Sequence, residues 1–404
     1  MNHAPSFIRN QQKNFLRLLA RLRPHLRTDP ALPARLQKLL SQNRTFGARD
    51  RRLYRELLYT AIRYWPWLEP RLDKKPDHVA RAVAWLAPET PVTHDYRAAL
   101  VADWPSLPSN ILARAEFLKG EGLPLPAWFR AHCPGLFSSP QLEAMLSRAP
   151  FWLRLQTPVP QPVFDEFASR EWKWRRTAVL PSAIELLTLD ADLSKTVSYQ
   201  SGLIEVQDLG SQLLLETIGV EPGGRWLDAC AGAGGKTLQL AFLLGPRGQV
   251  EAHDIRADAL RELRARSARA GLKNINVLTA RPAQPYDGVL VDAPCSGSGT
   301  WRRSPHLKWC TTPESVEKAA QTQLALLNEF APRVRPGGRL VYATCSLSRH
   351  ENEDIATAFL AAHREFAPAP YARTFASRTD GAGLTFLPAL HDTDGFFGMS
   401  LRRI

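Results

Sequence analysis

The stretch RWLDACAGAGGKTLQLAFLL (residues 225–244) predicts the fold of the C-terminal half of the chain. It begins with an apolar strand (225–229), continues through a glycine-rich turn and ends in a segment with helical composition (236–244). A strand that runs directly into a helix through a tight turn is the opening unit of an α/β sheet. The rest of the C-terminal half repeats this order of strand, turn and helix.

Further apolar strands follow this opening unit, and helices lie between or after them. The predicted strands are QVEAHDI (249–255), NINVLTA (274–280), DGVLVDA (287–293) and RLVYAT (339–344), and the predicted helices are 256–270, 314–334 and 350–362. Near-continuous apolar strands that alternate with helices predict a parallel, doubly wound sheet. Ligands of such a sheet bind outside the carboxyl ends of the strands, so the residues at those ends are the functional candidates.

The glycine loop after the first strand is a candidate cofactor site, because glycines let the backbone approach a ligand and the helix start offers free N–H groups. A Walker phosphate loop needs a glycine where Cys230 stands, and a dinucleotide loop needs a third glycine that GAGGKT lacks. S-adenosylmethionine remains, and Asp254, after the second strand, is placed to accept its ribose hydroxyls. The predicted cofactor site therefore comprises Asp254 and the loop residues Cys230, Ala231, Gly232, Ala233, Gly234, Gly235 and Lys236.

Two cysteines follow neighbouring strands of the predicted sheet. Asp292 and Cys295 lie in DAPCSGSG (292–299), and Cys345 lies in ATCSL (343–347). The two strands are neighbours in the usual order of this fold, about 4.8 Å apart, so two thiols and an acid should face one pocket. Cys230 and Cys310 have no such partner and are expected to be structural.

Two thiols beside a methyl donor suit one reaction in particular, the methylation of carbon 5 of cytosine. That carbon is too poor a nucleophile to take a methyl group directly, but a thiolate that adds to carbon 6 activates the ring. A carboxyl group such as Asp292 can polarise the nitrogen edge of the ring. A second thiol can assist the release of the covalent bond.

Composition excludes several other classes of protein. The 404 residues are 44% hydrophobic and 23% charged, which is typical of a globular chain. No apolar run approaches the length of a membrane span, and MNHAPSFIRNQQ (1–12) lacks the apolar core of a signal peptide. The five cysteines form no CxxC pair, so neither a disulfide framework nor a metal site is expected. We expect a cytosolic monomer that binds neither a membrane nor a metal ion.

Positive charge is concentrated at the N-terminus. Residues 1–75 hold 17 basic and 5 acidic side chains, and this surplus accounts for nearly all of the net charge of +13. Apolar residues at helical spacing over 7–70 predict a small helical bundle. Arginines are grouped with aromatic residues over 49–65, namely Arg49, Arg51, Arg52, Arg55 and Arg63 with Tyr54, Tyr59, Tyr64 and Trp65. We interpret this grouping as contact with RNA or DNA phosphates rather than as a solvated face.

Three parts are therefore expected along the chain. Residues 1–145 form the helical bundle and, from Lys74 to about Ser147, a proline-rich connector of short helices and turns. Residues 146–222 form a small α+β module, with strand-like runs at FWLRLQT (151–157), RRTAVL (175–180) and LIEV (203–206) and a helix near 162–172. Residues 223–404 form the doubly wound, Rossmann-like domain.

The chain resembles the Sun-type RNA cytosine-5 methyltransferases and, within them, the ribosomal-RNA methyltransferase B group. The resemblance rests on the glycine loop, DAPCSGSG and the motifs WFRAHC (128–133), FWLRLQT (151–157), VQDLGSQ (206–212), GGRLVYATCSLSRHENE (337–353) and HDTDGFFGMSL (391–401). It implies S-adenosylmethionine as cofactor and ribosomal RNA, in particular 16S, as substrate. Cys345 would be the nucleophile, Cys295 the releasing thiol, Asp254 the ribose ligand and Asp292 a contact to cytosine or cofactor. The run 46–65 resembles a NusB-like RNA-binding domain, and the module 146–222 would also bind RNA.

Two alternatives stay open at the level of the sequence. The third strand of the family usually ends in an acid, whereas Ala280 stands there, so a degenerate methyltransferase that serves as an RNA-binding scaffold is one alternative. Methylation of DNA is the other, because the DNA-modifying relatives use the cysteine of the Pro-Cys motif, here Cys295, as nucleophile. In that case Cys345 would be dispensable.

Overall fold

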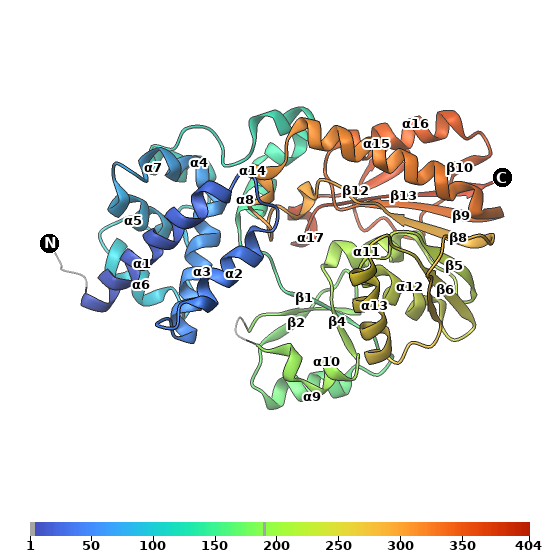
Figure 1. Cartoon of the computed structure of the whole chain (residues 1–404), viewed down its shortest axis with the longest axis horizontal. Coiled ribbons are helices and arrows are strands. Elements are labelled where there is room, and N and C mark those ends of the chain that lie inside the picture. Colours follow the sequence, from blue (N-terminus) through green and yellow to red (C-terminus); the bar gives the residue numbers. More distant parts are fainter. Residues whose placement is uncertain (1–4, 189–190) are drawn as a thin grey trace. The chain divides into compact units, whose positions relative to one another are not determined.

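The computed structural model describes residues 5–188 and 191–404 and divides them into two compact units. The helical unit comprises the chain up to Arg148 together with Trp301–Thr312, and the sheet unit comprises Ala149–Thr300 and Pro313–Ile404. Figure 1 shows the elements of each unit.

The helical unit buries one apolar stripe from each of its longer helices. In the first helix the stripe is Phe15, Leu18, Leu19 and Leu22, spaced so that all four point to one side. The predicted bundle and the predicted connector of short helices are both confirmed. The helices are α1 (Ser6–Leu22), α2 (Leu32–Gln42), α3 (Ala48–Arg63), α4 (Trp65–Leu68), α5 (Pro76–Leu86), α6 (His94–Val101), α7 (Ile111–Leu118), α8 (Ser139–Leu146) and α14 (Leu307–Cys310).

The aromatic residues of α3 and α4 lie in the core of this unit. Tyr54, Tyr64 and Trp65 are at most 2% exposed, and Arg63 is buried as well. Arg49 forms an ion pair with Asp95. The prediction that this group contacts nucleic-acid phosphates is therefore wrong for Arg63, and Tyr54, Tyr64 and Trp65 belong to the core. The apolar spacing of the two helices, which fills the core, accounts for the cluster.

The segment Trp301–Thr312 packs into the helical unit although the sequence around it belongs to the sheet unit. The ammonium of Lys308 donates to the carbonyl oxygens of Arg63 (2.9 Å) and Pro124 (3.0 Å). The ring of Trp301 lies 4.6 Å from that of Phe129. Because Lys308 is 1% exposed and donates to carbonyl oxygens rather than to acids, burial lowers its pKa well below the ordinary value.

The sheet unit begins with a small antiparallel sheet. Its strands are β1 (Trp152–Leu155), β2 (Trp174–Arg176), β3 (Ala183–Leu186) and β4 (Ile204–Val206), in the order β2-β3-β1-β4. The helices α9 (Gln161–Ser169) and α10 (Val197–Gln200) accompany it. The predicted α+β module is confirmed, with β3 as a strand that the sequence pattern did not indicate.

A nine-stranded sheet forms the body of this unit, in the order β11-β12-β13-β9-β8-β5-β6-β7 with β10 paired to β13. The predicted strands appear as β5 (Gly224–Asp228), β6 (Gly248–Ala252), β7 (Ile275–Val277), β8 (Tyr286–Asp292) and β9 (Val334–Thr344), and these five are parallel to one another. The prediction of a doubly wound sheet is confirmed. An antiparallel extension was not predicted: β10 (Phe366–Pro368), β11 (Arg378–Asp380), β12 (Gly383–Phe386) and β13 (Phe396–Arg403).

Helices cover both faces of the parallel strands (Figure 1). On one face Leu227 and Val289 pack with residues of α15 (Pro313–Phe330) and α16 (Glu353–Ala362). On the other face Trp226 and Leu290 pack with α11 (Leu209–Ile218) and α12 (Gly235–Leu244). The helix α13 (Ala257–Arg269) follows β6, and α17 (Pro388–His391) lies between β12 and β13. Successive strand residues thus face opposite layers, as the period of a strand requires.

Within the part of the chain that the structure describes, no helix is long and apolar enough to cross a membrane.

Candidate active site

A pocket of about 690 Å³ opens at the carboxyl ends of β5, β6 and β8. Loop residues after these strands form one side of it, and α15 contributes Thr322, Leu326, Glu329 and Phe330 on another. Most of the predicted cofactor residues line it: Cys230, Ala231, Gly232, Ala233, Gly235, Lys236, Asp254 and Asp292, together with Cys295. The topology of the sheet therefore brings residues from four separate segments to one cavity.

The glycine loop owes its shape to two left-handed residues. Gly232 and Gly234 have φ of 53° and 92°, and Gly234 immediately precedes α12. A Cβ at Gly234 would lie 2.8 Å from side-chain carbons of Leu238 and Leu263, so a larger residue does not fit there. Gly234 does not line the pocket itself but sets the direction in which the first N–H groups of α12 point.

Asp254 lies at the rim of this loop. Its carboxylate accepts hydrogen bonds from the backbone N–H of Gly232 (2.8 Å) and from the backbone and side chain of Arg256 (2.9–3.0 Å). Burial opposes the ionised form, but these hydrogen bonds outweigh it and lower the pKa of Asp254. The acid is thus held ionised beside Ile255, an apolar side chain that is 93% exposed in the pocket. A charged acceptor next to a bare apolar surface fits a ribose and an adenine.

A buried cation links the glycine loop to the second strand end. The ammonium of Lys236 donates to Asp292 at 2.8 Å and is 8% exposed. Burial lowers the pKa of Lys236, but attraction to Asp292 and to Cys345 outweighs this effect. The net pKa of Lys236 therefore lies above its ordinary value, and the side chain stays protonated. Beneath it, burial raises the pKa of Asp228 to about 7, although Asp228 accepts a hydrogen bond from Thr237 at 2.7 Å.

The two predicted thiols meet at the edge of this pocket. The Sγ atoms of Cys295 and Cys345 are 3.2 Å apart. This hydrogen bond and burial raise the pKa of Cys295 well above its ordinary value, so Cys295 keeps its proton. Cys230, the other thiol of the pocket, has its pKa raised by burial and by nearby carboxylates. The arrangement therefore pairs one protonated thiol, Cys295, with Cys345, which also interacts electrostatically with the Lys236 ammonium.

A buried glutamate holds the two cysteine-bearing loops together. Glu351 is fully buried, and its carboxylate accepts hydrogen bonds from the backbone and hydroxyl of Ser296, from the hydroxyl of Ser346 and from the amide of Gln323. Ser296 follows Cys295 and Ser346 follows Cys345, so one carboxylate fixes the residue next to each thiol. Glu351 lies in the motif 337–353, but the sequence alone indicated no role for it. An acid six residues after Cys345 is the only sign of it in the sequence, and only the fold brings this acid to Ser296.

The lining also contains residues that sequence reasoning did not single out. These are Ser211, Ala229, His253, Ile255, Arg256, Arg281, Pro294, Thr322, Leu326, Glu329 and Phe330. Arg281 follows the position of Ala280, where an acid was expected, and it forms an ion pair with Glu329 at 3.4 Å. Cys310 lies in the helical unit, where its thiol contacts the carbonyl oxygen of Leu26. No group of three or more metal-ligating side chains was found among the residues described.

Comparison with known proteins agrees with this geometry. Residues 216–402 match the family described as 16S rRNA methyltransferase RsmB/F. The chain is 33% identical over 261 residues to a probable ribosomal RNA small subunit methyltransferase B of Bacillus subtilis, an alignment that covers 60% of this chain and 56% of that protein. The resemblance to Sun-type methyltransferases is thereby confirmed. The chain spans about half the length of the curated relatives that it matches.

Two solved structures share the fold. The crystal structure of PH0851 is 21% identical with a TM-score of 0.76 and covers 97% of this chain and 99% of its own. The structure of NSun6 from Pyrococcus horikoshii with SFG is 20% identical with a TM-score of 0.61 and covers 69% of this chain and 98% of its own.

Proposed function

Because residues 216–402 are a methyltransferase domain of the RsmB/F type, we propose that the whole chain methylates carbon 5 of a cytosine in 16S ribosomal RNA. The observation that carries the proposal is the pair of thiols at 3.2 Å beside a pocket suited to a nucleoside. Methylation of an oxygen or of an exocyclic amine needs no thiol, whereas carbon 5 of a pyrimidine needs a nucleophile that activates the ring. A substrate of this kind would place the activity in the cytoplasm.

S-adenosylmethionine is the cofactor of this domain, and the residues present fit it. Asp254 would bind the ribose hydroxyls and Ile255 the adenine, and the N–H groups at the start of α12 would bind the carboxylate. Bound there, the cofactor supplies an electrophilic methyl group. Arg256 occupies both oxygens of Asp254, so its exposed side chain has to swing aside before a ribose can bind.

We propose the following roles for the protein's own groups. The thiolate of Cys345 adds to carbon 6 of cytosine, which makes carbon 5 nucleophilic toward the methyl group. Asp292, held by Lys236, orients and polarises the nitrogen edge of the ring. After the proton on carbon 5 passes to solvent, the bond between carbon 6 and Cys345 breaks. The hydrogen bond from Cys295 stabilises the sulfur that leaves.

The same proposal assigns a different function to each part of the chain. Residues 223–404 would perform the chemistry, whereas residues 1–145 and the module 146–222 would bind RNA. The positive surplus of the N-terminal residues supports this assignment.

Transfer of radiolabelled methyl groups from S-adenosylmethionine to small-subunit particles, followed by bisulfite sequencing of their 16S RNA, tests the proposal. The expected result is one or a few cytosines that resist conversion only when the protein is present. A protein that bound RNA but neither bound S-adenosylmethionine in a calorimeter nor transferred methyl groups would be the scaffold instead. Activity that survived replacement of Cys345 would favour the DNA-type mechanism through Cys295.

A further inference from the structure

A row of positive charge runs along α1. Arg9, Lys13, Arg17 and Arg21 recur at every fourth position, so they share one face of the helix. All four are exposed, and their side chains make no hydrogen bond or ion pair with the described part of the chain. Like charges four residues apart destabilise a helix. A row of this kind therefore costs stability in the free protein and becomes favourable only beside a polyanion.

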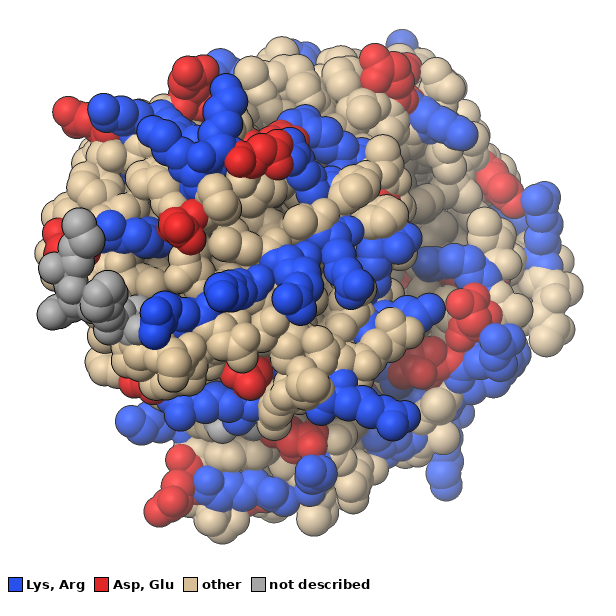
Figure 2. All heavy atoms as spheres, turned by 60° about the vertical axis from the view of Figure 1, so that its left-hand side comes forward, with Lys and Arg blue, Asp and Glu red and all other residues tan. Residues whose placement is uncertain are grey.

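Three other arginines of the same region are paired with acids. Arg23 pairs with Asp73, Arg27 with Glu69 and Arg49 with Asp95, each at 2.8 Å. These three acids neutralise arginines outside the row, whereas no acid among the described residues pairs with the row itself. Figure 2 shows how Lys and Arg side chains gather in a row across one face, with few acidic side chains among them.

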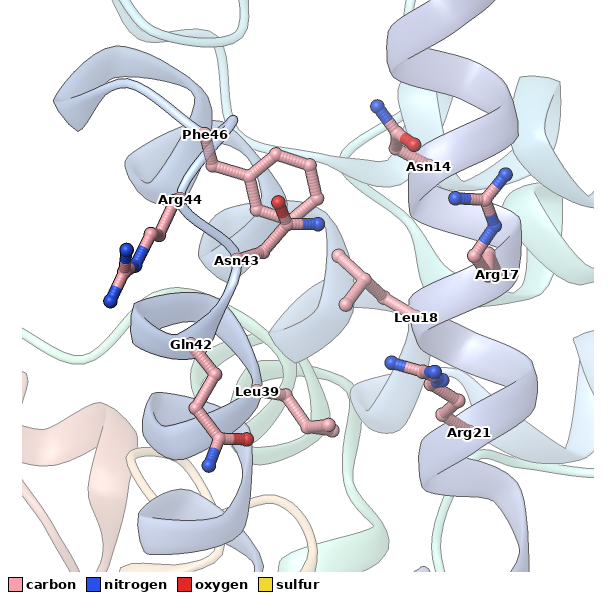
Figure 3. A pocket seen from close by; sticks show the side chains of 9 residues that line it. All are labelled: Asn14, Arg17, Leu18, Arg21, Leu39, Gln42, Asn43, Arg44 and Phe46. Atoms are coloured by element: carbon pink, nitrogen blue, oxygen red, sulfur yellow. The ribbon is translucent and has the colours of Figure 1, made fainter.

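A pocket of about 390 Å³ lies beside this row, between α1 and the loop that follows α2. Its apolar part consists of Leu18, Leu39 and Phe46, and Figure 3 shows these side chains between the two walls. Arg17 and Arg21 stand on the α1 side, and amide side chains stand on the loop side.

The amides on the loop side are free to bind a ligand. Asn43 uses its carbonyl oxygen to accept hydrogen bonds from Thr45, which leaves its amide nitrogen as a donor. Gln42 is exposed and has no partner among the described residues. The pocket therefore combines a small apolar floor, in which Leu39 is half-buried and Leu18 and Phe46 are buried, with amide groups that pair with a base edge and guanidinium groups that bind phosphate.

We infer that α1 and this pocket form a docking site for one unstacked nucleotide within a single-stranded segment of the substrate RNA. The inference rests on the proposed function, which makes RNA the substrate. Four residues of helix rise by about 6 Å, which is similar to the spacing of phosphates along one strand, so the row matches a sugar-phosphate backbone. A base can enter the pocket only when it is not paired in a duplex, which selects a loop or an unpaired strand.

The test uses the full chain, because Trp301–Thr312 packs into the helical unit and a truncation would expose it. Arg17→Gln combined with Arg21→Gln is compared with Arg27→Gln combined with Arg49→Gln, which removes the same charge from paired positions. The probe is a fluorescent 20-nucleotide single-stranded RNA, titrated by anisotropy at several salt concentrations. We expect the first double variant to bind about tenfold or more weakly and to lower the salt slope by about 1.4, and the control to change affinity by less than about twofold.

A second pair of measurements tests the pocket apart from the charges. Gln42→Ala combined with Asn43→Ala should weaken binding of the intact RNA severalfold and leave the salt slope unchanged. With an RNA of the same length that lacks bases, this variant and the unmodified protein should bind equally. A fully paired RNA of the same length should also bind to this variant and to the unmodified protein with equal affinity.

The outcomes separate this inference from the proposed function. Equal weakening by the two arginine double variants, or an unmodified protein that does not bind the single strand, overturns the docking site. A site confirmed by these titrations in a protein that transfers no methyl group to 16S RNA overturns the proposed function alone. Tighter binding of an acidic peptide than of RNA would indicate a protein partner and also overturn the inference.

Discussion

The Sγ atoms of Cys295 and Cys345 lie 3.2 Å apart, although fifty residues separate them in the sequence. They approach because β8 and β9 are adjacent parallel strands, so the loops after them leave the sheet side by side. The burial of Cys295 and its hydrogen bond to Cys345 raise the pKa of Cys295 well above its ordinary value. The protonated state of Cys295 underlies the first prediction.

Replacement of Cys345 and replacement of Cys295 should affect methyl transfer in different ways. Cys345→Ala should reduce methyl transfer at least about a thousandfold and abolish any covalent adduct, because the neighbouring thiol, Cys295, keeps its proton and should not add to carbon 6 in its place. Cys295→Ala should allow addition but slow release, so a protein–RNA adduct stable in denaturing gels should accumulate. An adduct that appeared with Cys345→Ala instead would reverse the assignment.

Removing the buried cation should make Cys345 harder to ionise. Lys236→Met takes away a nearby positive charge and leaves Asp292 without its ion-pair partner, so the pKa of Cys345 should rise. The measurement is the pH dependence of alkylation by iodoacetamide, read for the Cys345 peptide by mass spectrometry. Lys236→Arg keeps the charge and should keep the profile; a profile that Lys236→Met left unmoved would contradict the electrostatic link.

Glu351 should act by positioning the thiol loops rather than by touching the substrate. Glu351→Gln keeps the size of the side chain but replaces one carboxylate oxygen by an NH2 group beside the hydroxyls of Ser296 and Ser346, which donate to Glu351 at present. This loss of a charged acceptor should cost about 1–3 kcal/mol of stability. We expect methyl transfer to fall about 10- to 100-fold with an unchanged affinity for S-adenosylmethionine. Asp354→Asn, an exposed acid nearby, is the control. A change in cofactor affinity for Glu351→Gln would show that its role is not confined to the loops.

Replacement of Asp254 and replacement of Arg256 should have different effects on the affinity for S-adenosylmethionine. Asp254→Asn removes one acceptor for the ribose and should weaken binding of S-adenosylmethionine about 10-fold or more in calorimetry. Arg256→Gln frees the carboxylate from its present partner, so affinity should stay equal or increase. Asp258→Asn, on the first turn of α13, serves as the control. A loss of affinity in Arg256→Gln would mean that the arginine itself holds the cofactor.

The stability of the sheet unit should fall between acid and neutral pH because of Asp228. Its pKa is about 7 in the folded protein, against 3.8 for the free side chain, so between these values the unfolded chain holds fewer protons than the folded one. The free energy of unfolding should therefore decrease as pH rises from about 4 to about 7 and then level off. Asp228→Asn should flatten this part of the curve in urea titrations. Parallel curves for the two proteins would contradict the buried, protonatable carboxyl group.

The sequence predicted much of the sheet unit. Apolar strands, helical segments and glycine turns are local patterns, and they predicted the five parallel strands, the glycine loop and the strand ends at Asp254, Asp292, Cys295 and Cys345. Because the strand order of a doubly wound sheet follows from its connections, even the meeting of the two thiols was predictable. The antiparallel strands β10–β13 were missed, since their short runs have no helices between them to mark a repeating unit.

Only the tertiary structure decided the partners of the charged and polar groups. Arg17 and Arg49 look alike in the sequence, but Asp95 neutralises Arg49 and no described residue neutralises Arg17. Glu351 gains its role only because the fold brings Ser296 to it, and Lys308 is buried only because its segment packs into the helical unit. Periodicity reports which face of an element is apolar, whereas an ion pair or hydrogen bond depends on a second residue that may be far away in the chain. Such pairs are therefore settled by the packing of elements and not by the pattern within any one of them.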